Sequence, residues 1–234
     1  MDIRIESLLS GAAAAEGTVV IIDVLRAFTT AAVALARGAA KIVLVTRTSD
    51  ALELRRRGIG DLCIGEVDGK RPDGFDFGNS PFEVSTADVA GRTLIHSTTA
   101  GTIGVARARR ATALLAASLV NAAATAELIK TRHPELVTVV AMGAQGRTRA
   151  DEDELCALYL RSLLLGRRSD HDAIRRLVLA GAESQNYGDP TRPHFDPRDR
   201  DIALQIDSIP LAIVVAREGD LLVARAVASS DGKF

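Results

Sequence analysis

Tryptophan is absent from this chain, and aromatic residues make up only 3% of its 234 residues. So few aromatic side chains exclude a base-stacking platform of the kind that binds single-stranded nucleic acid. An excess of positive charge is also missing, because 29 Lys and Arg residues are balanced by 30 Asp and Glu residues, for a formal net charge of -1. The sequence therefore predicts no nucleic-acid partner.

Cysteine is equally scarce. The two cysteines, Cys63 and Cys156, can build neither a disulfide framework nor a thiolate zinc site. Unpaired thiols are typical of a reducing compartment, so we expect a cytoplasmic protein. Long apolar runs are missing too: the longest uncharged stretch, residues 111–126, is interrupted by polar residues such as Thr112 and Ser118. It is too short and too polar to span a bilayer, and we expect no membrane partner.

The remaining composition is that of an ordinary globular protein, with 47% hydrophobic and 25% charged residues. A largely disordered chain is excluded, because disorder requires low hydrophobicity with high net charge. The length suits one domain over residues 1–234, with room for a subdomain from about residue 150. The Ala-rich helical runs would permit close packing across a homodimer.

Short β-branched runs alternate with Ala- and Leu-rich runs along the chain. Strands are predicted at residues 18–22, 41–46, 61–65, 93–97, 112–116 and 137–142. Helices are predicted at residues 26–37, 49–57, 121–132 and 150–165, with another that ends at residue 110. This alternation indicates βαβ units, and thus a three-layer α/β/α sandwich with a mainly parallel sheet. Residues 210–216 and 221–227 are typical of a closing C-terminal hairpin, and Pro-rich residues 189–200 of a loop.

Several common phosphate-binding motifs are missing. No GxxxxGK[ST] motif is present, which excludes a P-loop NTPase, and no GxGxxG dinucleotide motif is present. Leu25 stands two residues after Asp23, where an aspartyl-phosphate enzyme of the haloacid dehalogenase type has a second Asp. Neither cysteine is followed six positions later by the Arg of a cysteine phosphatase, and four scattered histidines cannot supply a typical binuclear metallophosphatase.

Polar residues follow the predicted strands at the point where each strand ends. Asp23 follows the first strand, Glu66 the third, Thr99 the fourth, and the acidic run 151–154 comes after the last. Ligands of open α/β sheets bind beyond the carboxyl ends of the strands, so we expect these residues to converge there. Carboxylates suit Mg²⁺, whereas arginine and the amides at helix starts suit phosphate.

Each of these residues also has a purely structural interpretation. Asp23 could equally well cap the helix that follows it. Arg26 falls in the first helical turn, where the helix dipole disfavours a cation, so it should bind an anion or pair with Asp23. Thr29 and Thr30 could bond back to helix carbonyls, and Ser80 could cap a helix with proline at its first position.

No histidine is predicted to take part in the candidate site. His96 is predicted to be a core or edge residue, whereas His133, His171 and His194 are predicted to be surface residues.

Four segments, in order along the chain, resemble one known family. They are IDVLRAFTTAAVALARGA (residues 22–39), GFDFGNSPFE (74–83), STTAGT (97–102) and MGAQGRTRADEDELCA (142–157). Together they resemble the 2-phosphosulfolactate phosphatase family over roughly residues 18–160. The resemblance implies an α/β/α sandwich and Mg²⁺-dependent hydrolysis of a phosphate monoester on a small acidic substrate. In that family the substrate is (R)-2-phospho-3-sulfolactate, and the product, (R)-3-sulfolactate, feeds coenzyme M biosynthesis.

The resemblance and the sheet-edge positions together give the candidate site. The expected catalytic residues are Asp23, Arg26, Glu66 and Asp153. The expected Mg²⁺ ligands are Asp23, Glu66, Glu152 and Asp153. The expected substrate-binding residues are Thr29, Thr30, Asn79, Ser80, Thr98, Thr99, Gly101, Thr102 and Arg147.

The chain departs from the family pattern in three places: Phe28 stands where Thr is usual, Ala100 stands where Asn is usual, and residues 148–150 differ from the usual Phe-Ser-Leu. The change at Ala100 removes an amide that could contact substrate or metal. Asp23 could ligate the metal or become phosphorylated. Two further alternatives stay open at this point: a lyase or isomerase on the same scaffold, and a non-catalytic binder of a phosphorylated or carboxylated metabolite.

Overall fold

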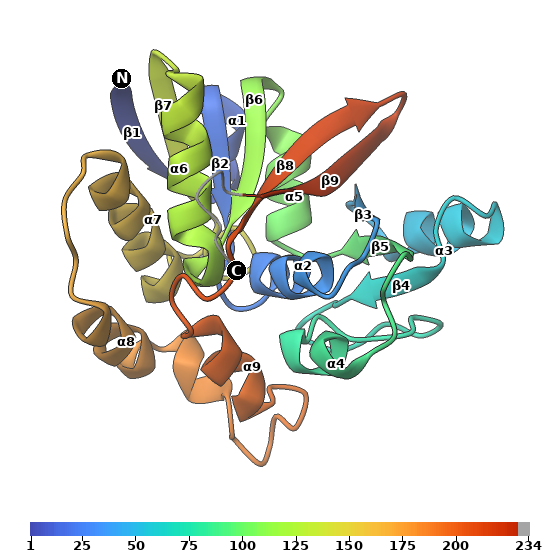
Figure 1. The fold of residues 1–234 in the computed structure, drawn as a ribbon. Coiled ribbons are helices and arrows are strands. Elements are labelled where there is room, and N and C mark those ends of the chain that lie inside the picture. Colours follow the sequence, from blue (N-terminus) through green and yellow to red (C-terminus); the bar gives the residue numbers. More distant parts are fainter. Residues whose placement is uncertain (229–234) are drawn as a thin grey trace.

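The computed structural model describes residues 1–228 of the chain, and within them one nine-stranded sheet runs through the whole molecule (Figure 1). Its strands are β1 (Asp2–Ser7), β2 (Glu16–Ile22), β3 (Lys41–Val45), β4 (Leu62–Gly65), β5 (Thr93–Ser97), β6 (Arg110–Ala117), β7 (Leu136–Ala141), β8 (Leu211–Glu218) and β9 (Leu221–Ala228). The helices are α1 (Leu8–Ala14), α2 (Ala27–Ala36), α3 (Thr48–Arg56), α4 (Pro81–Thr86), α5 (Gly101–Arg107), α6 (Ala122–Arg132), α7 (Asp151–Leu164), α8 (His171–Ala180) and α9 (Pro197–Ala203), with short 3₁₀ turns η1 (Leu119–Asn121) and η2 (Glu183–Asn186).

The sheet consists of two parallel halves joined by an antiparallel hairpin. The strand order is β1-β7-β2-β6-β8-β9-β3-β5-β4. β8 pairs with β6 and β9 pairs with β3, so the hairpin fills the gap between the halves. The predicted C-terminal hairpin is confirmed, and it closes the sheet from within. Its side chains Ile213, Val215 and Ala224 are buried in the core. Both of its outer edges pair with a neighbouring strand, so neither edge presents unpaired backbone groups to solvent.

Alternate side chains of each strand pack on opposite layers of helices, as the pleat of a strand requires. Val19 and Ile21 of β2 face the layer that contains α2, α4 and α5, whereas Val20 and Ile22 face α6 and α7. In the other half of the sheet, Val43 of β3 faces α3, on the same side as α6 and α7. The three-layer α/β/α sandwich with a mainly parallel sheet is thereby confirmed.

Helix α2 lies in the middle of the molecule (Figure 1), and every residue from Ala27 to Leu35 is buried. A helix that is apolar all round is typical of a core element. Its alanines permit close approach of neighbouring elements, and Phe28, at 0% exposure, is its largest side chain. Gly38, at φ +89°, ends this stretch with an amide that donates to the carbonyl of Leu35, as the sequence predicts.

The predicted strands and helices up to residue 165 are all present, with ends shifted by a few residues. The prediction misses β1, α1 and α8, and it assigns residues 189–200 to a loop although α9 begins at Pro197. β1 alternates between exposed and half-buried residues, so it lacks the apolar run typical of the central strands. The start of α8 carries a usable signal, because the side chain of Asp170 accepts hydrogen bonds from the amides of Asp172 and Ala173.

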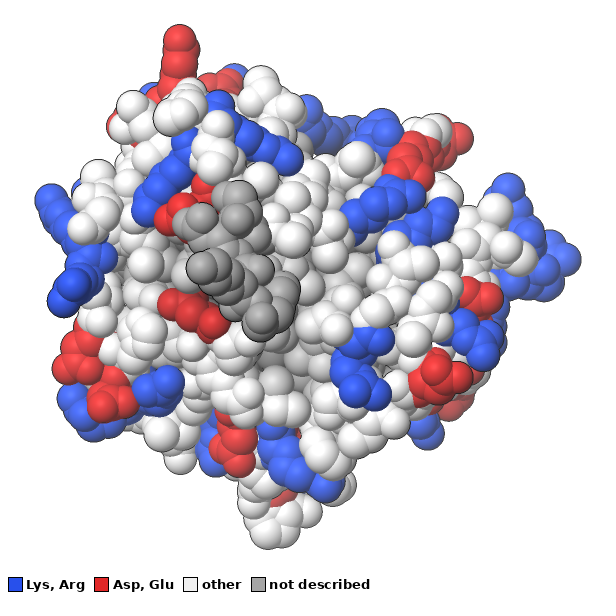
Figure 2. Space-filling view, viewed as in Figure 1, with Lys and Arg blue, Asp and Glu red and all other residues white. Residues whose placement is uncertain are grey.

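The surface carries charges of both signs. In the view of Figure 2, Lys and Arg side chains are interspersed with Asp and Glu. Among residues 1–228, no helix has the length and apolar character needed to cross a bilayer.

The complete burial of α2 generates a stability prediction. Phe28→Ala should lower the free energy of unfolding by about 3–5 kcal/mol, because it removes a fully buried ring from a helix that has no solvent-facing side. Urea denaturation measures the change. The control is Leu177→Ala on α8, whose side chain is 55% exposed and whose loss should cost under about 0.5 kcal/mol. Equal effects of the two substitutions would contradict the packing described for α2.

Candidate functional site

The carboxyl ends of β2, β4, β5 and β7 meet at a cavity of about 540 Å³. Asp23, Glu66, Thr99 and Gly143, which follow these four strands, all line it. The predicted convergence of these residues is therefore confirmed. The strands do not share one parallel edge, however, because β2 and β7 lie in one half of the sheet and β4 and β5 in the other, and the hairpin pairings reverse the strand direction between the halves. The far wall comes from a segment that sequence reasoning assigns no role; its lining residues are Glu183, Asn186, Thr191, Arg192, His194 and Phe195.

Buried carboxylates dominate the deep part of the cavity. Burial, together with the nearby charge of Glu66, raises the pKa of Asp23 to about 6. Burial and the charges of Glu183 and Asp23 raise the pKa of Glu152 to about 7. Burial and repulsion by Asp23 hold the pKa of Asp153 well above its ordinary value. Negative charge is thus crowded here beyond what the surrounding protein neutralises.

Asp153 holds two strand ends together. Its Oδ1 accepts a hydrogen bond of 2.7 Å from the amide of Val24, and its Oδ2 accepts one of 2.7 Å from the amide of Gly143. These amides follow β2 and β7, so the first turn of α7 ties both strands to the cavity floor. Asp23 in turn accepts a 3.0 Å hydrogen bond from the amide of Ala27, so it caps α2 while it lines the cavity.

Glu66 binds two loops rather than pointing freely into the cavity. Its Oε1 accepts hydrogen bonds from the amide and the hydroxyl of Thr99, at 2.7 and 2.8 Å. Its Oε2 accepts one of 2.8 Å from the amide of Gly69. The loop that follows β4 is therefore fixed to the turn that follows β5.

The hydrogen bonds of Asp153 and Glu66 leave fewer carboxylate oxygens for the expected Mg²⁺ site. Asp23, Glu66, Glu152 and Asp153 all line the one cavity. Within residues 1–228, however, no three His, Cys, Asp or Glu side chains converge closely enough to hold a metal ion. The physical reason is that Glu66 and Asp153 direct their oxygens at backbone amides. The donor set fits a cation in charge, and it fits an ion such as Mg²⁺, which takes one or two carboxylates and keeps several waters.

Arg26 joins two loops that are far apart in sequence. It precedes α2 as its N-cap residue, so it lies just outside the first turn expected for it. Its guanidinium donates to the carbonyls of His194 and Gly69, both at 2.9 Å, and lies 4.9 Å from the ring centroid of Phe195. Its ion pair is with Asp199, at 3.3 Å, and not with Asp23 as the salt-bridge alternative proposed.

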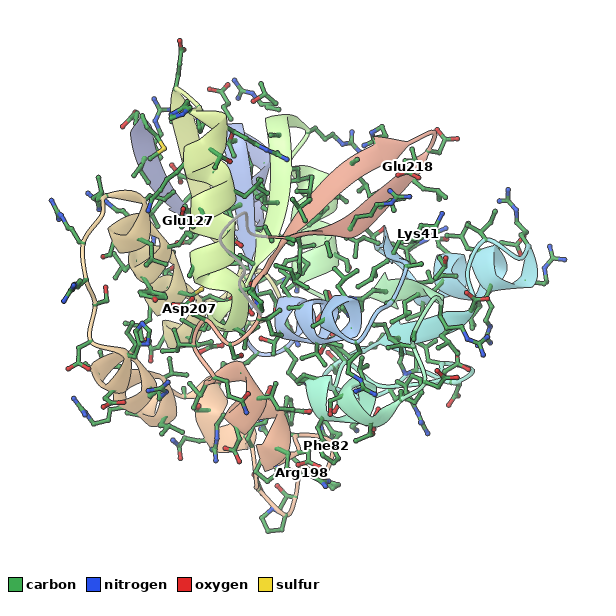
Figure 3. All side chains as sticks on the ribbon, in the orientation of Figure 1. Lys41, Phe82, Glu127, Arg198, Asp207 and Glu218 are labelled. Carbon is green, nitrogen blue, oxygen red and sulfur yellow. The ribbon has the colours of Figure 1, made fainter. Side chains whose placement is uncertain are left out.

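Asp199 is a site residue that the sequence reasoning missed. It is fully buried on α9, and its Oδ1 accepts hydrogen bonds from the hydroxyl of Ser80, at 2.6 Å, and from the amide of Phe82, at 3.0 Å. Nearby, Arg198 lies over the ring of Phe82 at 3.7 Å, where α9 meets α4 (Figure 3). Nothing in the local sequence distinguishes Asp199 from the other acids around it.

Two unpaired cations stand at the rim, opposite the carboxylates. Lys70 and Arg192 are exposed, line the cavity, and form no ion pair with any residue from 1 to 228. His194 lines the same wall, and partial burial together with the charges of Lys70 and Arg26 lowers its pKa. The cavity is therefore lined by buried carboxylates together with exposed charges of both signs, namely Lys70, Arg192 and Asp68.

Several residues expected to bind substrate do not line the cavity. The Thr29 hydroxyl donates to the Val24 carbonyl at 2.8 Å, and the buried Thr30 hydroxyl has no partner in the described part of the chain. Thr98 and Thr102 bond to each other, each amide donating to the other's hydroxyl at 3.0 and 3.1 Å. Thr29, Thr98 and Thr102 thus use their hydroxyls to stabilise the starts of α2 and α5.

Three further residues of this expected set, Ser80, Gly101 and Arg147, also do not line the cavity. Ser80 caps α4, with Pro81 at its first position, which is the alternative given above. A Cβ on Gly101 would lie 2.9 Å from Oδ2 of Asp23, so the close approach of α5 to that carboxylate requires glycine. Arg147 is exposed in the turn after β7, outside the cavity. Of the expected substrate-binding set, Asn79 and Thr99 line the cavity.

Comparison with known proteins gives one consistent result. A family model described as 2-phosphosulpholactate phosphatase matches residues 4–189. A Thermus thermophilus protein is 33% identical over 233 residues, covering 98% of this chain and 92% of its own length. A Cyanothece protein is 41% identical over 157 residues, and one from Deinococcus radiodurans is 43% identical over 133 residues. All three are named probable 2-phosphosulfolactate phosphatase.

These matches differ in extent. The matched part spans 64% of the Cyanothece protein and 55% of the Deinococcus protein, less than two thirds of either length. The family match ends at residue 189, so Arg192, His194 and Phe195 of the cavity wall lie beyond it.

The crowded carboxylates generate a pH prediction. Glu152 ionises near pH 7 in the folded chain but near its ordinary value of about 4.3 when unfolded. Its stabilising contribution is therefore complete below about pH 4 and is lost as the pH rises through about 7. Glu152→Gln should exceed the wild type in free energy of unfolding by roughly 2 kcal/mol at pH 8 and by much less at pH 5.

Guanidinium denaturation with a chelator present measures this gap. The buried His96, whose pKa is lowered to about 3 by burial, destabilises both proteins equally as the pH falls, so its effect cancels. A gap that stays constant, or that narrows toward pH 8, would contradict the crowding of charge described here.

The Arg26 bridge generates a second prediction. Arg26→Lys should speed amide hydrogen exchange by at least tenfold in both residues 66–70 and residues 192–196, because one ammonium cannot replace three directed N–H groups. Exchange detected by mass spectrometry measures this. Arg55→Lys is the control, since Arg55 binds Asp76 and the carbonyl of Gly74 on the outer side of the same loop. If residues 192–196 kept their protection in Arg26→Lys, the bridge would not hold them.

Proposed function

The chain belongs to the 2-phosphosulfolactate phosphatase family, and from this premise we propose that it hydrolyses the phosphate monoester of a small acidic metabolite. The proposed substrate is (R)-2-phospho-3-sulfolactate, and the products are (R)-3-sulfolactate and inorganic phosphate. The observation that carries the proposal is a cavity that combines buried carboxylates with two exposed cations, Lys70 and Arg192, that have no ion-pair partner within residues 1–228. The reaction would run in the cytoplasm and supply coenzyme M biosynthesis.

We further propose Mg²⁺ as the cofactor. Asp23 and Glu152 would hold it, because both line the cavity and the pKa of each is raised by burial and neighbouring negative charge. When bound, the ion would neutralise charge on the phosphoryl oxygens and on the carboxylates together. Asp153 would act indirectly, since its two amide hydrogen bonds fix the strand ends that carry the site.

The chain's own residues would divide the remaining work. Lys70 and Arg192 have no ion-pair partner within residues 1–228, so they would attract the acidic groups of the substrate into the mouth of the cavity. Arg26 would add positive charge to the cavity wall while it keeps the Gly69 and His194 loops in place. In the hydrolysis itself, water attacks phosphorus, the bond from phosphorus to the ester oxygen breaks, and the released alkoxide takes up a proton.

Ala100 bears on the choice of substrate. It lines the cavity and is 7% exposed, so the departure from the usual Asn lies in the wall that the ligand would contact. A substrate panel therefore has to include phosphorylated carboxylic acids without a sulfonate, such as 2-phosphoglycerate.

Phosphate release tests the proposal. We expect turnover of 2-phosphosulfolactate with Mg²⁺ and at least a hundredfold slower release after chelation. Asp23→Asn should lower kcat at least a hundredfold, because it removes the charge that the cation and the capped helix both use. The control is Asp50→Asn, which changes an acid paired with Arg47 on the outer surface and should leave kcat unchanged.

Three other outcomes would reject the proposal. Conversion of a substrate without phosphate release would indicate a lyase or isomerase. Ligand-dependent thermal stabilisation without any conversion would indicate a binding protein. Full activity of Asp23→Asn would remove that residue from the reaction.

A further inference from the structure

His96 lies in the core beside the cavity without reaching it. It belongs to β5, is 0% exposed, and pairs in register with Leu44 of β3 and Ile64 of β4. Its Nε2 lies 3.2 Å from Oδ1 of Asn79, a residue of the cavity wall. Its other ring nitrogen, Nδ1, is buried and has no hydrogen-bond partner among residues 1–228.

This arrangement determines which ring nitrogen carries the proton. Burial lowers the pKa of His96 to about 3, so the ring is neutral and has a single N–H. A buried N–H without an acceptor is rarer and costlier than a buried acceptor without a donor. Because Nδ1 has no partner, the proton belongs on Nε2, where it can be donated to Asn79 Oδ1.

Asn79 is held from both sides along the backbone. The amide of Gly78 donates to Glu83 Oε2 at 2.8 Å, and the Ser80 hydroxyl accepts from the amide of Glu83 at 3.1 Å. Asn79 itself is 5% exposed. With its backbone fixed, the side chain has one remaining choice: which end of its amide group faces the cavity.

We propose that His96 is a positioning residue for the proposed phosphatase reaction: its Nε2–H binds Oδ1 of Asn79 and thereby turns the Nδ2 amide group of Asn79 into the cavity. Within residues 1–228, Nδ2 of Asn79 donates to no protein atom, so both of its N–H bonds are available to a ligand. Asn79 thus presents neutral donors to an oxyanion of the substrate, among walls that are otherwise rich in carboxylates.

The polarity of this one amide has a clear consequence for binding. If the amide were reversed, Oδ1 would face the cavity and would repel the oxygens of a phosphate or sulfonate. The amide has nearly the same shape in both orientations, so packing alone cannot choose between them. The choice depends on the donor that His96 supplies. The inference rests on the proposed function for its kinetic part only.

Nitrogen NMR of the full chain with ¹⁵N-labelled histidine tests the structural part without any activity. The expected result is a neutral His96 ring with its proton on Nε2, retained on titration from pH 8 to pH 5. A proton on Nδ1, or a charged ring in this range, would overturn the inference whether or not the protein hydrolyses phosphate esters. Absent phosphatase activity together with the Nε2–H form would instead reject the proposed function.

Kinetics of substituted proteins test the link to Asn79. His96→Leu keeps an apolar group of similar size without a donor and should lower kcat/KM roughly tenfold. His96→Gln carries an N–H that can reach Asn79 and should restore most of the loss. In an Asn79→Ala background, His96→Leu should have no further effect, because the group it orients is gone. Losses that multiply in the double variant would overturn the inference.

A control separates positioning from stability. Cys63→Ala removes a buried side chain from β4, the strand that pairs with β5. Cys63 lies on the opposite face of the sheet from His96. It should lower the melting temperature without changing kcat/KM. If Cys63→Ala and His96→Leu lowered kcat/KM equally, His96 would have only a structural role.

Discussion

The structure depends most on the burial of several like-charged carboxylates at the place where four strands end. Isolated buried charges are costly, and burial raises the pKa of Asp23, Glu152 and Asp153. The charge of Asp23 raises the pKa of Glu152 and of Asp153 further. The chain tolerates them by directing backbone amides at Asp23 and Asp153. Those same hydrogen bonds fix the ends of β2 and β7, so the groups that make the site acidic also make it rigid. The residual negative charge is the reason for proposing a bound cation at this site.

The ion pair of Arg26 and Asp199 fixes the parts of the cavity wall that do not follow a strand end. The pair links the end of β2 to α9, and through Ser80 and Phe82 it links both to α4. Figure 3 shows the outer side of the same junction, where Arg198 covers Phe82. A loop containing two prolines, Pro190 and Pro193, can thus serve as a defined wall, because its carbonyl at His194 accepts a hydrogen bond from a side chain some 170 positions earlier.

Much of this arrangement is predictable from the sequence. The features that are not predictable have identifiable physical causes. The apolar strands and the residues after them predict the sheet and many residues that line the cavity. Parallel pairing brings Glu66 and Thr99 to one end of their half of the sheet, and Asp23 and Gly143 to one end of the other half. Parallel pairing does not predict that these two ends meet, because the pairings of the hairpin reverse the strand direction between the halves. The hydrogen-bond partner of each side chain is harder to predict. Thr29 and Thr98 carry the hydroxyls that a ligand site uses, yet both turn to the backbone. Asp199 and Arg192 come from segments whose position depends on long-range packing, so no local pattern reveals them.

The hairpin inserted between the two parallel halves has a consequence for the order of assembly. Every other strand precedes residue 142, whereas β8 and β9 begin at Leu211 and Leu221. The edges of β6 and β3 that the hairpin covers therefore stay without their partners until residues 211–228 have been synthesised. Contacts between such distant segments form slowly, because a long loop must close, at a cost in entropy, before the contacts can stabilise the fold. The two halves can gain structure separately, but a continuous sheet arises only when the final pair of strands docks between them.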